Sequence, residues 1–398
     1  TRPHNTLSDQ LGLDVPWLIC GLVCVAAIFA LSYFEISVAA KVLTVLLLTE
    51  IAILAVLAVA VLVQGGGPDG LMPEVLAPMG AFQPNGLAVA SIGLAMFIAF
   101  WSWTGFESTV MYGEESRDPK KIIPVATMIA VTGVGIFYIF VSWMTIAGNG
   151  AEASIALSTS ANPLDLFFTP TENFVGDWAV TTMEWLMITG SFACAMAFHN
   201  AASRYGYALG REGLVPRALG RTHPRYRSPY VASLTQTVVA ALWLFGFAAF
   251  DKDPYLDVFV LLAVLGTFSL LIVQTITMAA VFRYFMHNHP EESYWRTKVA
   301  PVVGGLSMAA VVFLMIDNLD TAAGPAATSL LFKLVPFISA ALFVWGAAQA
   351  LYLRKADPVK YETIGHVVLA DDSHAPVVVG DSQAQRAVDL DDVVEQER

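Results

Sequence analysis

The feature that most constrains this chain is a succession of apolar runs, each about 20 residues long and nearly free of charge. A helical run of this length crosses the hydrocarbon core of a bilayer, which is about 30 Å thick. The runs are rich in Leu, Val, Ala, Ile and Phe with inserted Gly, Ser and Thr, and they lack the alternation of barrel strands. We therefore predict an all-α polytopic membrane protein.

The composition agrees with a membrane protein. The chain is 56% hydrophobic and only 14% charged, whereas soluble domains are roughly 25% charged. Its three cysteines, Cys20, Cys24 and Cys194, all lie in apolar runs without a metal-binding spacing. No nucleotide-binding or zinc-protease motif and no basic nucleic-acid patch is present. The sequence predicts no metal, no cofactor and no nucleic-acid partner, and it offers only Glu50 and Glu107 as a catalytic pair, so we expect no enzyme.

Nine spans are predicted, and the loops between them differ in charge on the two sides. Thirteen Lys or Arg residues fall on one side and three on the other, apart from those beyond Leu353. The positive-inside rule places the basic loops and the C-terminus in the cytoplasm. The predicted spans are 16–34, 37–63, 87–112, 123–147, 178–208, 230–250, 256–285, 299–316 and 330–353.

The chain divides into three parts. Residues 1–15 form an extracellular leader, and residues 16–353 form the transmembrane domain. Residues 354–398 carry ten acidic against five basic residues with little apolar content, which is typical of a disordered acidic tail. An odd number of spans with a cytoplasmic C-terminus puts the first residue, a threonine, outside, so we expect an N-terminal truncation.

One predicted span has polar residues where lipid-facing ones are expected. Residues 101–105 read Trp-Ser-Trp-Thr-Gly, and Glu107 follows. Trp101 and Trp103 point apart on a regular helix, so they line one cavity only if the helix unwinds. Unwinding is least costly at Ser102, Thr104 and Gly105, and would expose backbone groups to a polar solute. The alternative is a glycine notch that only packs tryptophans against neighbouring helices.

Two carboxylates lie inside predicted spans, where a charge is costly unless it is paired, hydrated or protonated. Glu107 lies in the inner half of span 87–112, and Glu50 lies at the centre of span 37–63. Each reads either as a proton-coupling or gating group or as a structural hydrogen bond between helices. His199 reads more readily as an interhelical donor than as a functional group.

Three passages resemble the amino acid–polyamine–organocation (APC) permease superfamily. WSWTGFESTVMYGEESRDPKKIIP is similar to its sixth span and the loop after it, and SRYGYALGREGLVPRALGRTHPRYRSP is similar to the loop between its eighth and ninth spans. ISVAAKVLTVLLLTEIAILAVLAVAVL is, more weakly, similar to its fifth span. The order and spacing of the three agree.

The resemblance implies a LeuT-like transporter with twelve spans arranged in inverted repeats. The nine spans predicted here correspond to the fourth to the twelfth of these. It implies a plasma-membrane permease that moves amino acids or related amines by alternating access, coupled to protons or by exchange. Carried over by position, Glu107 matches a coupling or gating carboxylate of some members. Glu50 falls near the place where some members hold a cationic lysine; here it is an acid, and it is expected as a second coupling or gating residue. The implied substrate-binding residues are Ile98, Trp101, Ser102, Trp103, Thr104 and Gly105. The alternative is a truncated, non-transporting remnant or an amino-acid sensor.

Overall fold

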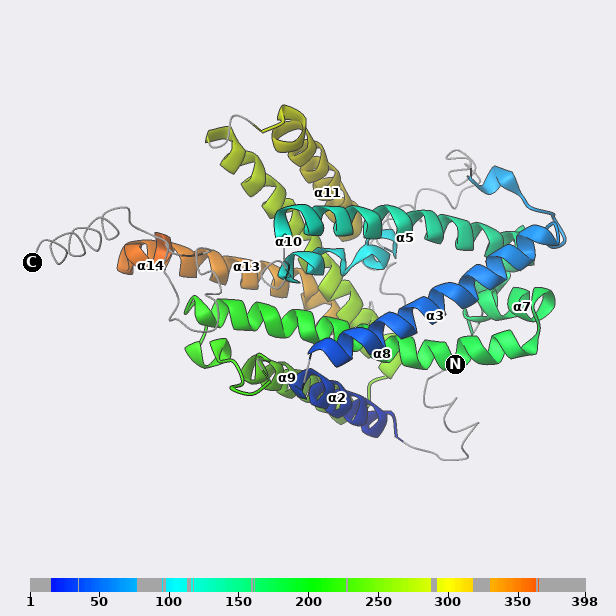
Figure 1. Cartoon of the computed structure of the whole chain (residues 1–398), viewed down its shortest axis with the longest axis horizontal. Coiled ribbons are helices and arrows are strands. Elements are labelled where there is room, and N and C mark those ends of the chain that lie inside the picture. Colours follow the sequence, from blue (N-terminus) through cyan, green and yellow to red (C-terminus); the bar gives the residue numbers. More distant parts are fainter. Residues whose placement is uncertain are drawn as a thin grey trace, which may run out of the picture.

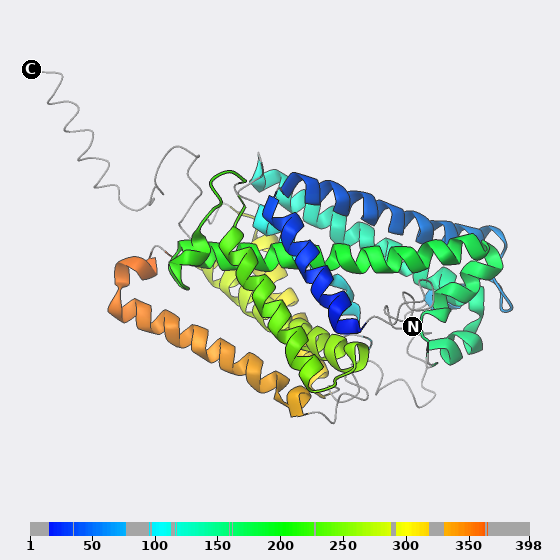
Figure 2. The same ribbon diagram turned by 90° about the horizontal axis from the view of Figure 1, so that it is seen from below.

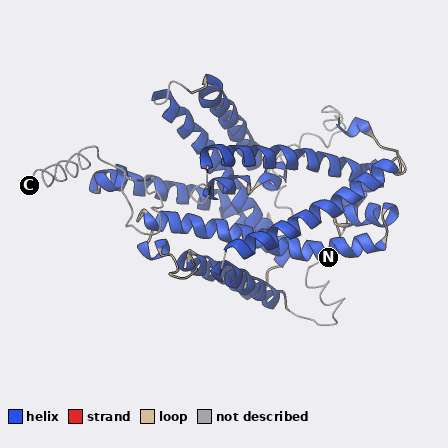
Figure 3. Cartoon of the chain, in the orientation of Figure 1, coloured by secondary structure: helices blue, strands red, loops and turns tan. Residues whose placement is uncertain are grey.

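The structure is a computed structural model. The residues that it describes are 16–34, 36–76, 95, 98–112, 116, 118–158, 160, 162–226, 228–287, 292–317, 330–362 and 364. Within these residues the structure is helical throughout and contains no β-strand (Figure 3). The predicted leader 1–15, Arg117 and most of the predicted tail lie outside the described residues.

Most of the described chain lies in long helices joined by short turns (Figure 1). The α-helices are α2 (Trp17–Phe34), α3 (Ile36–Val63), α5 (Pro119–Asn149), α6 (Ala151–Ser158), α7 (Asp165–Phe174), α8 (Asp177–Arg211), α9 (Tyr230–Ala249), α10 (Val260–His287), α11 (Ala300–Asp317), α13 (Leu330–Ala356) and α14 (Pro358–Glu362). The 3₁₀ turns are η1 (Pro73–Leu76), η2 (Phe106–Tyr112) and η3 (Arg217–Gly220), and π turns are η4 (Pro254–Phe259) and η5 (Trp295–Val299).

Six of the described helical stretches are long and apolar enough to cross a membrane. They are 43–63, 121–149, 230–249, 257–286, 295–317 and 332–356, and each lies within or close to a predicted span. Two further predicted spans correspond to α2, a shorter apolar helix, and to α8, a 35-residue helix that is more polar. The prediction of an all-α, multi-pass membrane protein is confirmed.

One half of the bundle packs around α3, α5 and α8, which lie side by side in both views (Figures 1 and 2). Its core includes Leu57 and Val61 of α3, Met144 of α5 and Met183 of α8, all buried. The short helix α7 packs against one end of this group through Phe167 and Phe168.

The other half packs around α10, which contacts both α11 and α13. Its core includes Val264 and Leu271 of α10, Met315 of α11 and Phe332 of α13. Figure 2 shows α13 along one edge of the bundle. The hydroxyls of Ser269 on α10 and Ser339 on α13 form a 2.9 Å hydrogen bond that joins these two helices.

The C-terminal end of α13 lies beside the basic loop that follows α8. Lys360 of α14 donates a 2.6 Å hydrogen bond from Nζ to the carbonyl oxygen of Gly213. Gly213 follows α8 and precedes the 3₁₀ turn η3. The loop between α8 and α9 and the end of α13 are therefore at the same end of the bundle.

Candidate functional site

The helix in the predicted span 87–112 is broken where Thr104 and Gly105 lie. Residues 98–103 are helical, the next two form a turn, and η2 begins at Phe106 (Figure 1). Gly105 has a φ of +117°, a conformation that residues with a Cβ rarely adopt. A glycine at this position therefore permits the break. We call residues 98–112 the broken segment.

Glu107 holds the break together from within the broken segment. Its Oε2 accepts a 2.9 Å hydrogen bond from the backbone N–H of Gly105. Tyr205 of α8 lies near the same carboxylate. Glu107 thus forms its hydrogen bond within the broken segment. This bond occupies the Gly105 N–H, a backbone donor that the break exposes.

The two tryptophans point to different neighbours. The ring of Trp101 meets Phe259 edge to face, with ring centroids 5.4 Å apart. The ring of Trp103 meets Tyr138 of α5 at 6.0 Å and lies against Gly135. Among the described residues the two rings thus meet different partners, and the helix unwinds only after Trp103.

The helical part before the break is tied to its own turn and to α5. Ser102 donates a 2.8 Å hydrogen bond from its hydroxyl to the carbonyl oxygen of Ile98. Tyr138 donates from its hydroxyl to the carbonyl oxygen of Ser102 at 3.4 Å. After the break, the hydroxyls of Thr109 and Thr127 are 2.7 Å apart, so α5 contacts the segment on both sides of Gly105.

Glu50 lies apart from the broken segment, between α3 and α8. Its carboxylate lies against Gly190, where an added Cβ would collide with Oε1. Oε1 is buried and has no hydrogen-bond partner among the described residues. The Cys194 thiol lies one turn further along α8, near this carboxylate. The hydrogen bond between helices that was the alternative explanation of Glu50 is not seen for this oxygen.

His199 makes the interhelical contact that was expected of it. Its Nε2 is 2.9 Å from the hydroxyl of Ser233, which links α8 to α9. Both side chains are buried. His199 is therefore explained by packing between these helices.

A cavity of about 310 Å³ opens beside the break. Trp103, Thr104 and Phe106 form its wall on the side of the broken segment, and Thr267 and Gln274 of α10 lie on the other side. The Thr267 hydroxyl is buried and has no partner among the described residues. The cavity therefore combines an apolar wall with uncharged hydrogen-bonding groups.

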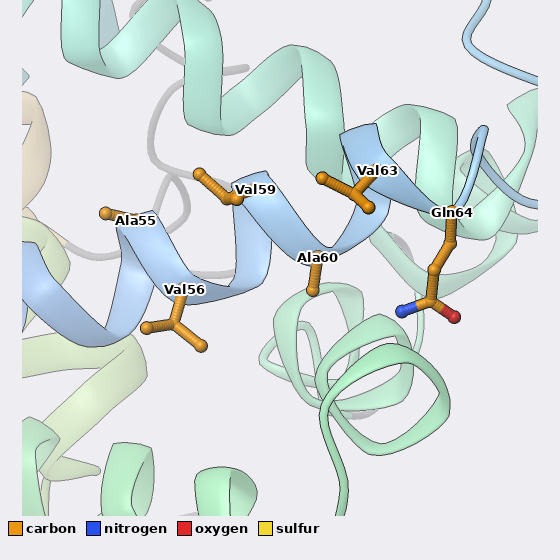
Figure 4. A pocket seen from close by; sticks show the side chains of 6 residues that line it. All are labelled: Ala55, Val56, Val59, Ala60, Val63 and Gln64. Carbon is orange, nitrogen blue, oxygen red and sulfur yellow. The ribbon is translucent and has the colours of Figure 1, made fainter.

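A second hollow, of about 480 Å³, runs along the outer face of α3 (Figure 4). Five of its six lining residues come from this helix, and the sixth, Gln64, directly follows the helix and is the only polar one among them. They are Ala55, Val56, Val59, Ala60, Val63 and Gln64. Because no polar groups converge on it, this surface resembles a lipid-facing helix side and not a solute site.

Several residues beside the break were not singled out from the sequence. Tyr138 and Phe259 are ordinary aromatic residues of apolar runs, and nothing local marks them as partners of the tryptophans. Thr267 and Gln274 did carry a signal, because they are seven positions apart and so share one face of α10. Among the described residues, no group of three His, Cys, Asp or Glu side chains gathers for a metal ion.

The family of the chain follows from comparison with known proteins. A family model described as "amino acid permease" matches residues 5–343, which is most of the chain. The chain belongs to the amino acid permease family. Its place in the APC superfamily, predicted from three passages, is thereby confirmed.

Three relatives are similar to the chain at 23%, 24% and 32% identity over part of its length. The branched-chain amino acid permease BcaP of Bacillus subtilis is 23% identical over 246 residues, covering 59% of this chain and 47% of BcaP. The low-affinity putrescine importer PlaP of Escherichia coli is 24% identical over 272 residues, covering 66% of this chain and 56% of PlaP. The gamma-aminobutyric acid permease of Escherichia coli is 32% identical over 167 residues, covering 41% of this chain and 33% of that permease. The chain thus spans about half the length, or less, of these relatives.

Proposed function

We propose that this protein is a secondary transporter that moves amino acids or related amines across the plasma membrane by alternating access. The observation that carries the proposal is the break at Gly105, inside a helix of a multi-pass membrane protein. A broken helix offers backbone donors and acceptors at membrane depth, where a polar solute finds no water. The names of the relatives, which include amino acid, gamma-aminobutyric acid and putrescine carriers, support this class of substrate.

Substrate recognition is proposed to centre on the broken segment. Gly105 supplies backbone groups, and Thr104 supplies a hydroxyl next to them. Trp101 and Trp103 flank the site on opposite sides, and Ile98 and Ser102 form the helical turn that leads into it. The substrate carboxylate would take the Gly105 N–H in place of the Glu107 carboxylate.

Glu107 is proposed as the gate of this site. While it is ionised, its carboxylate occupies the Gly105 N–H and repels a second carboxylate. Protonation weakens it as an acceptor and removes that repulsion. Proton binding therefore favours substrate binding, which is the coupling that proton symport requires.

Glu50 is proposed as a second coupling site. A buried carboxylate oxygen without a hydrogen-bond partner is stabilised by binding a proton or a cation. Its position between α3 and α8 lets a change of charge alter how these helices pack. We also propose that the C-terminal end of α13 and the loop after α8 face the cytoplasm, a side that their basic residues favour.

The test is uptake by the full-length protein in proteoliposomes. With an inward proton gradient, we expect labelled amino acids to accumulate, and a proton ionophore should abolish the accumulation. Preloaded unlabelled amino acid should accelerate entry if exchange operates. Binding of amino acids without any uptake or exchange would reject transport and favour an amino-acid sensor.

A further inference from the structure

The loop between α8 and α9 presents a basic surface. Residues 212–229 contain four arginines and one acidic residue, Glu212. Three of these arginines are exposed, and they are Arg217, Arg221 and Arg225. Arginines that are exposed and close together in the sequence create a positive potential, which attracts an anionic partner.

This loop is folded back on itself and is fixed to α2. The ring nitrogen Nδ1 of His223 accepts hydrogen bonds from the backbone N–H groups of Arg225 and Tyr226, both at 3.2 Å. The ring of His223 packs against Tyr33 at the end of α2, with ring centroids 5.2 Å apart. The hydroxyl of Ser228 donates a 2.9 Å hydrogen bond to the carbonyl oxygen of Tyr33. The backbone that carries the arginines is therefore held in place.

The C-terminal segment of the described chain meets the same loop. The Lys360 ammonium donates its 2.6 Å hydrogen bond to the carbonyl oxygen of Gly213, at the start of the loop. The backbone N–H of Lys360 donates a 3.0 Å hydrogen bond to Oδ1 of Asp357, which fixes the first turn of α14. Ile364, four residues after Lys360, is the last residue that the structure describes. The chain beyond Ile364 therefore starts close to the basic loop.

The sequence that follows Ile364 is acidic. Residues 365–398 contain eight acidic residues and two arginines. Five of the acidic residues lie within residues 389–397, which we call the acidic segment. They are Asp389, Asp391, Asp392, Glu395 and Glu397.

The covalent chain is long enough to bring the acidic segment to the arginines. Asp389 is 25 positions after Ile364, and Arg225 is 12 positions after Gly213. An extended chain spans at most about 3.6 Å per residue, so Arg225 lies at most about 43 Å from Gly213, whereas 25 residues reach about 80 Å. All three exposed arginines are within reach.

We propose that the acidic segment binds the three exposed arginines of the loop between α8 and α9 within the same molecule. Its carboxylates supply the opposite charge, and the link through α14 gives the two partners a high effective concentration. Each exposed ion pair contributes little, so the contact depends on several charges acting together and weakens in salt. Anionic lipid headgroups are the competing ligand of these arginines. The inference concerns residues outside the broken segment and does not depend on the proposed function.

The experiment uses the full-length protein in nanodiscs of phosphatidylcholine and phosphatidylglycerol. The photo-crosslinking amino acid p-benzoylphenylalanine replaces Val394, which lies within the acidic segment. After irradiation, mass spectrometry measures the yield of crosslinks to the loop between α8 and α9. We expect these crosslinks to be the main product within the protein at about 0.05 M salt, and to fall at least about threefold at about 0.5 M salt, where charges are screened. A yield that does not change with salt would overturn the proposal.

A matched set of variants tests the charges. The triple variant Arg217→Glu, Arg221→Glu and Arg225→Glu should lower the crosslink yield about tenfold. Changing the five carboxylates of the acidic segment to lysine in the same protein should restore the yield. Arg296→Glu, at an exposed position in η5, is the control and should keep the wild-type yield. The same yield in the wild type and the triple variant, both with a normal size-exclusion profile, would overturn the proposal, and a low yield in both would favour anionic lipid as the ligand of the loop.

Discussion

At the scale of single residues, the Glu107 carboxylate and the substrate carboxylate are proposed to compete for one backbone donor, the N–H of Gly105. Gly105 presents its N–H at a φ of +117°, and Glu107 accepts it at 2.9 Å. A gate of this kind responds to the charge of Glu107 more than to its size. The side-chain amide of glutamine has nearly the same shape as the carboxylate but no charge, so it separates the two effects.

Glu107→Gln should therefore make the rate of uptake less dependent on pH. The amide resembles the protonated carboxyl at every pH, so the substrate carboxylate meets no repulsion at the higher values. Initial rates of labelled amino-acid uptake measure this. Glu152→Gln, at an exposed position on α6, is the control and should keep the wild-type profile. A wild-type pH profile in Glu107→Gln would remove Glu107 from the gate.

Glu50→Gln should separate accumulation from exchange. Removing its charge takes away a site for the coupling proton or cation but leaves the broken segment intact. We expect gradient-driven accumulation to fall while exchange of internal for external amino acid continues. Equal losses of both activities would show that Glu50 is needed for the fold or for substrate binding and not for coupling.

At the scale of helices, the sequence predicted the long apolar elements well, because a run of about 20 apolar residues has few alternatives in lipid. It also located the unwinding near Gly105, since glycine next to threonine marks weak helix. The partners of the broken segment could not be predicted. Tyr138 and Phe259 reach the two tryptophans through packing between helices distant in sequence, and no local pattern encodes that packing.

The contact between α8 and α9 is expected to be structural. Ser233→Ala leaves the buried His199 ring nitrogen without its partner and should lower the stability by about 1 kcal/mol, as for other hydrogen bonds between membrane helices. The midpoint of thermal unfolding in detergent measures this. Ser191→Ala, at an exposed position on α8, should be nearly neutral. A large change in uptake with unaltered stability in Ser233→Ala would give this pair a functional role instead.

At the scale of the whole molecule, the proposed site lies at the break of the broken segment, within a multi-pass helical bundle. Both halves of the bundle have buried apolar cores, one around α3, α5 and α8 and the other around α10. The broken segment contacts both halves, through Tyr138 on α5 and Phe259 just before α10. A change at Gly105 is therefore able to reach both halves, which alternating access requires.

The most direct test of this account is amino-acid uptake by Gly105→Ala. An alanine Cβ there meets only Phe198 at 3.9 Å, so the substitution strains the backbone without a steric clash. Gly133→Ala is the matched control, because that glycine lies in helix α5 with nothing within 4 Å of an added Cβ. We expect Gly105→Ala to lose uptake while remaining folded, and Gly133→Ala to transport normally. Wild-type uptake by a folded Gly105→Ala protein would contradict the assignment of the break as the substrate site.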